Sequence, residues 1–360
     1  MKHALRSPMA KIAVGLLTGI GLLLLVSRFI SIAATLRVMQ QNLVTPRGMV
    51  LALLSGVAFL LAFSIRGMRW KLFLSPISAI STGKAIQLFL VSVFINFLVP
   101  IGGGDLAKAL MLKRIAALPI SRSLPTVAMD RSLDLLPAFA IMIIVPFLSV
   151  QMDIRLWLVL CAVGGLFIAL VCFVGLTIWK RTTAIALLHR LTELLPRAIG
   201  SKMEAFAAGF VDSLLAGASR PYIFLPAVAL TCLAVTCDSL FALFAFWAIG
   251  LPISPGTAIF GYTIYNLFFI FPTPPGQIGS NEAVGLFVFT GLLHLPADKV
   301  AAMFIFSHPW AALLMTIAGL ICLKTLGLKI SATMKMQPDE SNGDSQEVFS
   351  FEEQKVSIGD

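Results

Sequence analysis

The stretch NFLVPIGGGD, residues Asn96–Asp105, interrupts one long apolar run of the chain, and NLFFIFPTPPGQIGSNE, residues Asn266–Glu282, interrupts another. Each stretch meets a proline, turns through glycines and ends on a carboxylate. Hydrocarbon cannot hydrogen-bond an opened backbone, so such interruptions persist only where protein buries them or where they line a wet cavity. Carboxylates at that depth and paired interruptions both point to a transport site. We call the two stretches the first break and the second break.

The composition of the 360 residues places the chain among membrane proteins. Hydrophobic residues make up 58% and charged residues only 12%, with a mean hydropathy of +0.95, which excludes a water-soluble domain. The five cysteines lie in apolar runs and the four histidines are scattered, so we expect no disulfide and no metal site. No nucleotide-binding signature occurs, and we expect neither a cofactor nor a nucleic-acid partner.

Apolar runs of membrane length predict an all-α, polytopic fold with about eight passes, of which one or two are broken or re-entrant. The runs lie at about residues 12–36, 48–65, 85–101, 123–150, 155–179, 222–249, 283–293 and 299–323. From asparagine to acid the separation is nine residues in the first break and sixteen in the second. An inverted internal repeat is compatible with these spacings but does not follow from them.

Basic residues set the expected orientation of the chain. They precede the first apolar run and follow the last, so the positive-inside rule places both termini in the cytoplasm. The basic stretch after the first break also favours the cytoplasm. Two arrangements satisfy it: residues 85–118 return as a re-entrant hairpin, or they form two short spans with the basic stretch in a cavity.

Two domains are expected. Residues 1–328 form the transmembrane domain, in which residues 180–220 carry apolar stripes at helical spacing. These stripes predict cytoplasmic amphipathic helices, which either lie in the membrane interface or pack against the bundle. Residues 329–360 hold three lysines and seven acids without apolar periodicity, which predicts an acidic, disordered cytoplasmic tail.

Acidic residues outside the breaks also fall in or beside the apolar runs. Asp130 and Asp134 lie four residues apart on one helical face, and Arg131 can reach Asp134 at three residues. This group is either an internally neutralised ion pair or part of a headgroup site. Asp238 lies near the middle of a long span with apolar neighbours. It is expected to face the bundle interior, protonated or paired with a distant base.

With these motifs the chain resembles the transmembrane domain shared by lysylphosphatidylglycerol synthases and stand-alone flippase-like membrane proteins, over about residues 10–325. Three family motifs carry the resemblance, and the last is matched in full. The matching residues are Asn96, Pro100, Gly104, Asp105, Lys108 and Arg114, then Asp130, Arg131 and Asp134, then Pro272, Pro275, Gly276, Gly279 and Glu282. The chain departs at Ile101–Gly103, where the family usually has an arginine or similar polar group. It departs again at His308, where the family often has arginine and a histidine would make phosphate binding sensitive to pH.

The resemblance implies binding and flipping of an amphipathic or anionic lipid, or a lipid-linked precursor, across the cytoplasmic membrane. The aminoacyl-transfer domain of the synthases does not follow Leu328, so we expect no enzymatic activity. Lipid-biosynthesis enzymes are candidate partners. Two alternatives remain open. One is a non-transporting accessory subunit of a lipid-modification or hopanoid pathway. The other is a polyprenyl-dependent glycosyltransferase, which the acid-free loop Arg37–Arg47 disfavours.

The expected lipid site combines the two breaks with the nearby charged residues. The breaks would meet near the membrane midplane, and their amide groups would bind an anionic headgroup with help from basic side chains. The predicted site residues are Asn96, Pro100, Gly104, Asp105, Lys108, Arg114, Asp130, Arg131, Asp134, Asp238, Asn266, Pro272, Pro275, Gly276, Gly279, Glu282 and His308.

Overall fold

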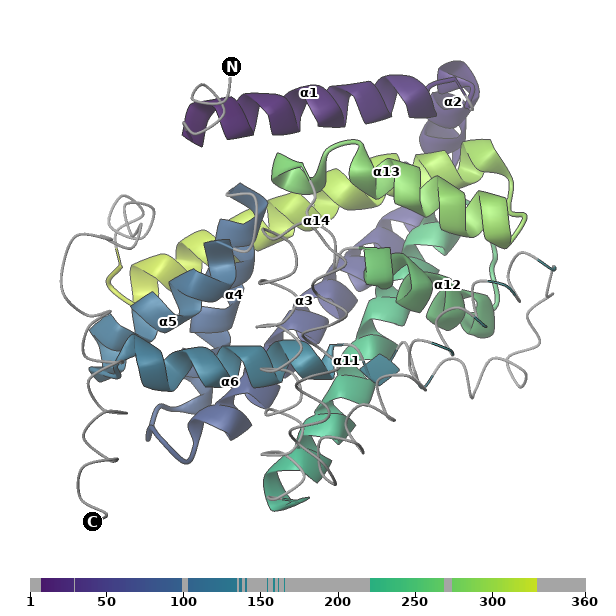
Figure 1. Ribbon diagram of the computed structural model, residues 1–360. Helices are drawn as coiled ribbons and strands as arrows, with labels where there is room; N and C mark the ends of the chain where they lie inside the picture. Colours follow the sequence, from purple (N-terminus) through teal and green to yellow (C-terminus); the bar gives the residue numbers. More distant parts are fainter. Residues whose placement is uncertain are drawn as a thin grey trace, which may run out of the picture.

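All elements in the described part of the chain are helices (Figure 1). The computed structural model describes residues 8–28, 30–98, 103–134, 221–268 and 274–328, with single positions between 136 and 165. Three helices are long and apolar enough to span a membrane: α3 (Pro46–Leu74), α11 (Pro221–Ala248) and α14 (Ala297–Thr325). The prediction of an all-α, polytopic membrane fold is confirmed. The number of passes, the helices expected at 180–220 and the tail at 329–360 lie outside the described residues.

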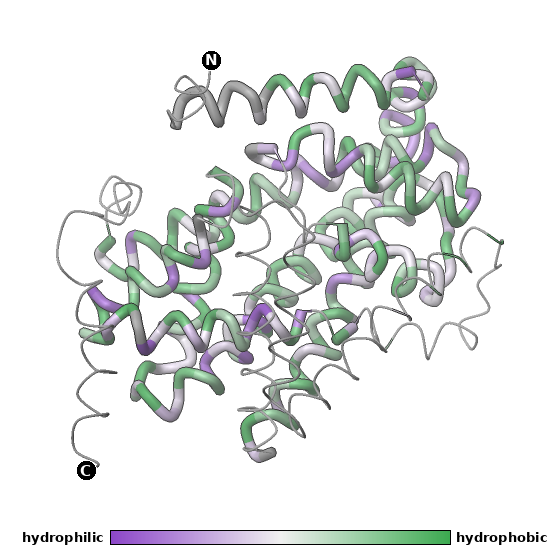
Figure 2. Tube along the Cα trace, viewed as in Figure 1, coloured by the Kyte–Doolittle hydropathy of each residue, from purple (hydrophilic) through white to green (hydrophobic). Residues whose placement is uncertain are grey.

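Helices α3 and α11 form the central antiparallel pair. At the middle of α3, the Phe59 ring lies 5.3 Å from the Phe241 ring, which is late in α11, and nearer the end of α3 Arg69 contacts Thr231, which is earlier in α11. Small residues, Ala62 and Ala234, are buried in the same contact and allow the two backbones to approach closely. Figure 2 shows mostly apolar residues along both helices and several hydrophilic positions along the neighbouring α5 (Gly103–Ala116) and α6 (Ile120–Leu133).

Helix α4 (Thr82–Leu98) packs antiparallel against α14. Gly319 makes this contact close, because a Cβ atom there would lie 2.6 Å from the Phe94 side chain. About one turn further along α4, the Phe97 carbonyl oxygen lies 3.9 Å from a Cβ built on Gly276, in the second break. The second break contacts the middle of α14, so α4 ends partway along that span.

Helix α5 returns along α4. The Asn96 side chain accepts a hydrogen bond from the Gly104 amide at 2.7 Å, and one turn later the Lys108 ammonium lies 4.0 Å above the Phe89 ring. A Cβ on Gly104 would lie 2.0 Å from the Ser92 carbonyl oxygen, so only glycine fits this crossing. Of the two arrangements open from the sequence, these contacts favour the hairpin.

The N-terminal region differs from its prediction. The run expected to form one span at 12–36 is divided into α1 (Pro8–Val26) and α2 (Ile32–Leu43). Ser31 ends the run because its hydroxyl caps α2 at the Ala34 amide, 3.3 Å away, while its own amide donates to Asp298 of α14 at 3.0 Å. Helix α1 lies across the second break (Figure 1).

The second break itself continues into a short helical layer. Helix α12 (Pro255–Leu267) precedes it, followed by the 3₁₀ turn η4 (Pro275–Gln277), α13 (Ser280–Gly285) and the π-helix η5 (Leu286–Leu292). Helix α14 begins at Ala297, two residues before the last apolar run was expected to start. Aromatic rings from α11, η5 and α14 fill the core beneath this layer, with Phe289 at 4.9 Å from Phe246 and 5.9 Å from Phe304.

Candidate functional site

Charged side chains from four helices meet between α3, α5, α6 and α11. We call this group the inner charge cluster. Its members are Arg66 and Arg69 of α3, Asp105 and Lys108 of α5, Asp130, Arg131 and Asp134 of α6, and Asp238 of α11. Four bases therefore face four acids, and the fully ionised cluster carries no net charge. Six of the eight are residues that the sequence predicted for the site.

The inner end of the cluster is sealed. Arg69, with 1% of its side chain exposed, donates to Asp130 at 2.8 Å and to Asp134 at 2.7 Å. Its remaining nitrogen donates to the Thr231 hydroxyl of α11 at 3.1 Å. Removing charges from water costs several kcal/mol per ion unless hydrogen bonds compensate it, and Arg69 satisfies this condition by contacting two helices at once.

Lys108 lies at the centre of the cluster with incomplete hydrogen bonding. Its ammonium is fully buried, 3.4 Å from Asp105 and 3.5 Å from the second oxygen of Asp130, and 5.5 Å from the Trp70 ring. In the described part of the chain, neither this ammonium nor that Asp130 oxygen has a hydrogen-bond partner. Buried polar atoms are normally satisfied, so the centre of the cluster retains unused hydrogen-bonding capacity.

The outer end of the cluster is open. Arg131 has 44% of its side chain exposed and holds Asp105 with two parallel hydrogen bonds of 2.8 and 3.0 Å. The predicted contact between Arg131 and Asp134 is confirmed at 3.4 Å. Lys108 and Arg131 both form ion pairs with the Asp105 carboxylate, at 3.4 and 2.8 Å. Asp105 is therefore an anion held on an exposed guanidinium.

Asp238 is paired with a distant base, which is one of the two states expected for it from the sequence. Arg66 of α3 donates to both oxygens of this carboxylate, one of them at 3.2 Å. The sequence did not identify Arg66 or Arg69 as site residues, because both follow Ile65, where the apolar run was expected to end. The helix continues through Leu74, which places both inside the bundle.

The second break forms a separate polar group around His308 of α14. Its Nδ1 lies 2.7 Å from Glu282 and its Nε2 lies 2.8 Å from the Gly276 carbonyl oxygen. The other Glu282 oxygen accepts the Gly279 amide at 2.9 Å. Gly276 and Gly279 have φ angles of 64° and 77°, in the left-handed region that favours glycine. We call Glu282 and His308 the Glu282–His308 pair.

The two breaks touch through Phe97 and Gly276, but no hydrogen bond or ion pair among the described residues joins the inner charge cluster to the Glu282–His308 pair. Arg114 and Asn266 are exposed and belong to neither group. Pro100 and Pro272 lie outside the described residues, and the side chain of Pro275 is likewise not described.

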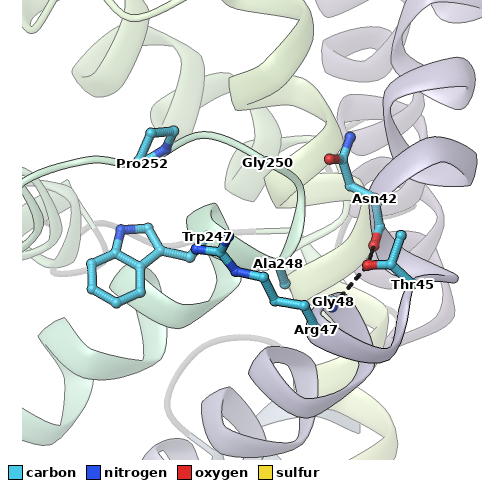
Figure 3. Close-up of a pocket in the computed structure, with 8 residues that line it drawn as sticks. All are labelled: Asn42, Thr45, Arg47, Gly48, Trp247, Ala248, Gly250 and Pro252. Atoms are coloured by element: carbon cyan, nitrogen blue, oxygen red, sulfur yellow. Dashed lines mark hydrogen bonds between the residues drawn. The ribbon is translucent and has the colours of Figure 1, made fainter.

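A small cavity of about 170 Å³ lies at the opposite end of α3, where that helix begins beside the end of α11 (Figure 3). Within it the Thr45 hydroxyl donates to the Asn42 carbonyl at 2.6 Å and accepts the Gly48 amide at 3.0 Å. None of the predicted site residues lines this cavity.

Comparison with known protein families places this arrangement. The family model for the lysylphosphatidylglycerol synthase transmembrane region matches residues 11–319, which include both breaks and all eight members of the inner charge cluster. The match is to the transmembrane region of those synthases. No curated protein and no solved structure matches the chain. The chain is therefore a multi-pass membrane protein that belongs to the family of the lysylphosphatidylglycerol synthase transmembrane region.

Proposed function

We propose that this protein binds and flips an amphipathic lipid, or a lipid-linked precursor, with an anionic headgroup across the cytoplasmic membrane, and that it catalyses no covalent reaction. The observation that carries the proposal is the open end of the inner charge cluster. There Arg131, whose side chain is partly exposed, forms a bidentate ion pair with the carboxylate of Asp105.

A headgroup phosphate has the geometry to take the place of Asp105. The guanidinium fork that binds two carboxylate oxygens binds two phosphate oxygens equally well. Asp105 has 27% of its side chain exposed and is free to turn outward when a headgroup enters. Lys108, whose ammonium lacks a hydrogen-bond partner, then lies directly behind the exchanged group. The cluster thus stays neutralised when empty and offers two cations when occupied.

Depth in the membrane supports a role in headgroup entry. Arg66 lies eight residues before the end of α3, roughly 12 Å along a helix at 1.5 Å per residue. The ends of α3 and α14 carry Lys71 and Lys324, and by the positive-inside rule we assign that side, with the C-terminal tail, to the cytoplasm. The N-terminus, expected on the same side, precedes the described residues. The cluster then lies where headgroups of the cytoplasmic leaflet reach.

Lipid flipping in reconstituted vesicles tests the proposal. Full-length protein is reconstituted with fluorescent phospholipids of anionic or zwitterionic headgroup, and movement is followed by quenching from one side. Arg131→Gln should slow movement of the anionic lipid about tenfold or more, the effect of losing hydrogen bonds to a charged group. Arg114→Gln is the matched control, because Arg114 is exposed on α5 and outside the cluster. If the native protein moves neither lipid, the proposal fails and an accessory role is favoured.

A further inference from the structure

His308 lies between two hydrogen-bond acceptors, and this restricts where its protons are. Its Nε2 is 2.8 Å from the Gly276 carbonyl oxygen, which has no proton to donate. Nε2 must therefore carry a hydrogen. A neutral imidazole has only one N–H, so its Nδ1 would then present a lone pair.

That lone pair faces a second acceptor. Nδ1 is 2.7 Å from a Glu282 oxygen, a distance at which one of the two atoms must hold a proton. The proton belongs either to an imidazolium beside a carboxylate or to a carboxylic acid beside a neutral imidazole. In both cases the site contains one proton more than a neutral histidine and an ionised glutamate would bring.

We infer that the Glu282–His308 pair is a proton-binding site, loaded in this structure, that fastens the second break to α14. Without the extra proton the imidazole can donate to Glu282 or to Gly276, but not to both. Its other nitrogen then turns a lone pair toward an acceptor at under 3 Å. Loss of the proton therefore releases either α13 or η4 from the span.

The Glu282–His308 pair lies in buried, apolar surroundings, where the extra proton decides whether a net charge remains. Only 12% of the His308 side chain and 9% of the Glu282 side chain are exposed. With the proton the pair is neutral overall, and without it one negative charge remains in apolar surroundings, where an uncompensated charge is costly. In the described part of the chain, no lysine or arginine forms an ion pair with either group.

The other groups that face the pair do not replace the proton. From α12, Tyr265 hydrogen-bonds Asn281, next to Glu282, and Tyr262 stacks on Tyr265. The Asn96 amide of α4 is engaged with Gly104. Where α1 crosses the second break, the described side chains between residues 17 and 26 are uncharged. The inner charge cluster makes no contact with the pair among the described residues, so the proton is the charge partner that the geometry provides.

This inference goes beyond the proposed lipid movement and offers that movement a coupling ion. The break that the proton fastens touches the end of α4 through Phe97 and Gly276, and α4 leads into the helix that carries Asp105 and Lys108. A proton gradient would thus act on the segment that separates the two sites.

Hydrogen–deuterium exchange of the purified full-length protein tests the inference without any lipid assay. Amide protection in residues 274–285 is measured from about pH 5 to about pH 9, where histidine and buried carboxyl groups titrate. We expect protection in the native protein to fall about tenfold or more as the pH rises, since a hydrogen bond within a charged pair is lost. Amides of the α3–α11 pair serve as the internal reference.

Two variants should abolish this pH dependence while keeping the protection. In His308→Arg the cation is permanent. In Glu282→Gln the side-chain amide donates its own hydrogen to Nδ1, and its oxygen still accepts the Gly279 amide. His294→Asn is the control, because it removes an exposed histidine and should keep the native dependence.

The inference is overturned if the native segment is equally protected at all pH values, or if Glu282→Gln retains the native pH dependence. The Glu282→Gln result decides the matter if the arginine variant does not fold. Since exchange is measured without lipid transport, a failure of the proposed flipping leaves this result intact, and the reverse also holds.

Discussion

The inner charge cluster and the Glu282–His308 pair hold buried polar groups by different means. The cluster uses four permanent cations against four carboxylates, close to the basic ends of α3 and α14. The pair uses one histidine, one glutamate and backbone groups, at eleven residues into α14. That is roughly 17 Å along a helix at 1.5 Å per residue. Most charges of the cluster thus lie toward the basic ends of the helices, whereas the Glu282–His308 pair contains no lysine or arginine.

The difference follows from the cost of ions in hydrocarbon, which rises toward the bilayer centre. Near the interface, water reaches Arg131 and the other partly exposed members, so a dense group of ions is affordable if it is balanced. Deeper in the membrane the same number of ions would need far more compensation. At the Glu282–His308 pair the inferred proton compensates the charge of the Glu282 carboxylate. Substitutions can distinguish compensation by balanced ions from compensation by a proton, and the largest expected loss of stability comes first.

Removing Arg69 should have the largest effect on stability. Arg69→Ala leaves Asp130 buried without its arginine partner and should lower the free energy of unfolding by about 3–5 kcal/mol. Thermal unfolding in detergent measures the loss. The double variant Arg69→Met, Asp130→Leu should recover most of it, because apolar side chains of similar size need no compensation. A double variant as unstable as Arg69→Ala would contradict a balance of charges as the reason for the pairing.

Gly279→Ala should be the next most damaging change, and it acts on the second break through sterics alone. The residue has φ of 77°, and its new Cβ would lie 2.2 Å from the Gly19 carbonyl oxygen of α1. Left-handed strain and overpacking together suggest a loss of about 3 kcal/mol. Gly276→Ala is the matched control, since it has φ of 64° but no neighbour closer than 3.6 Å. Equal losses for the two variants would show that the contact with α1 carries no weight.

His308→Ala should cost less, and its cost should depend on pH. It removes two hydrogen bonds, one of them within a charged pair, so about 1.5–3 kcal/mol is expected at low pH. The native protein keeps this stabilisation only while the folded state holds the extra proton, so it should decline as the pH rises. Thermal unfolding of the two proteins over the same pH series measures the difference. A difference that is constant with pH would contradict a shared proton at this site.

The residues of the Glu282–His308 pair could be predicted from the sequence more completely than those of the inner charge cluster, and the reasons are local. A complete motif with two left-handed glycines and an acid marks the second break, and these features act within a few residues. The inner charge cluster depends on α3 continuing past Ile65, where hydropathy turns polar. Arg66 and Arg69 are therefore recognisable only when Asp130, Asp134 and Asp238 are placed opposite them. Ion pairs between helices depend on the tertiary structure, and a hydropathy profile does not predict them.

Breaking the ion pair between Arg131 and Asp105, at the open end of the cluster, should have the smallest effect on stability and, where Arg131 is lost, a large effect on transport. The contact between Arg131 and Asp105 is partly exposed, so Arg131→Gln and Asp105→Asn should each lower the free energy of unfolding by less than about 1 kcal/mol. Arg131→Gln should nevertheless slow movement of an anionic lipid about tenfold, because it removes the guanidinium that would bind the headgroup phosphate, whereas Asp105→Asn removes only the competing carboxylate and should not slow it. Unfolding and vesicle assays on the same preparations measure the two quantities. Variants that lose stability in proportion to transport would show that this end of the cluster is structural, as its inner end is.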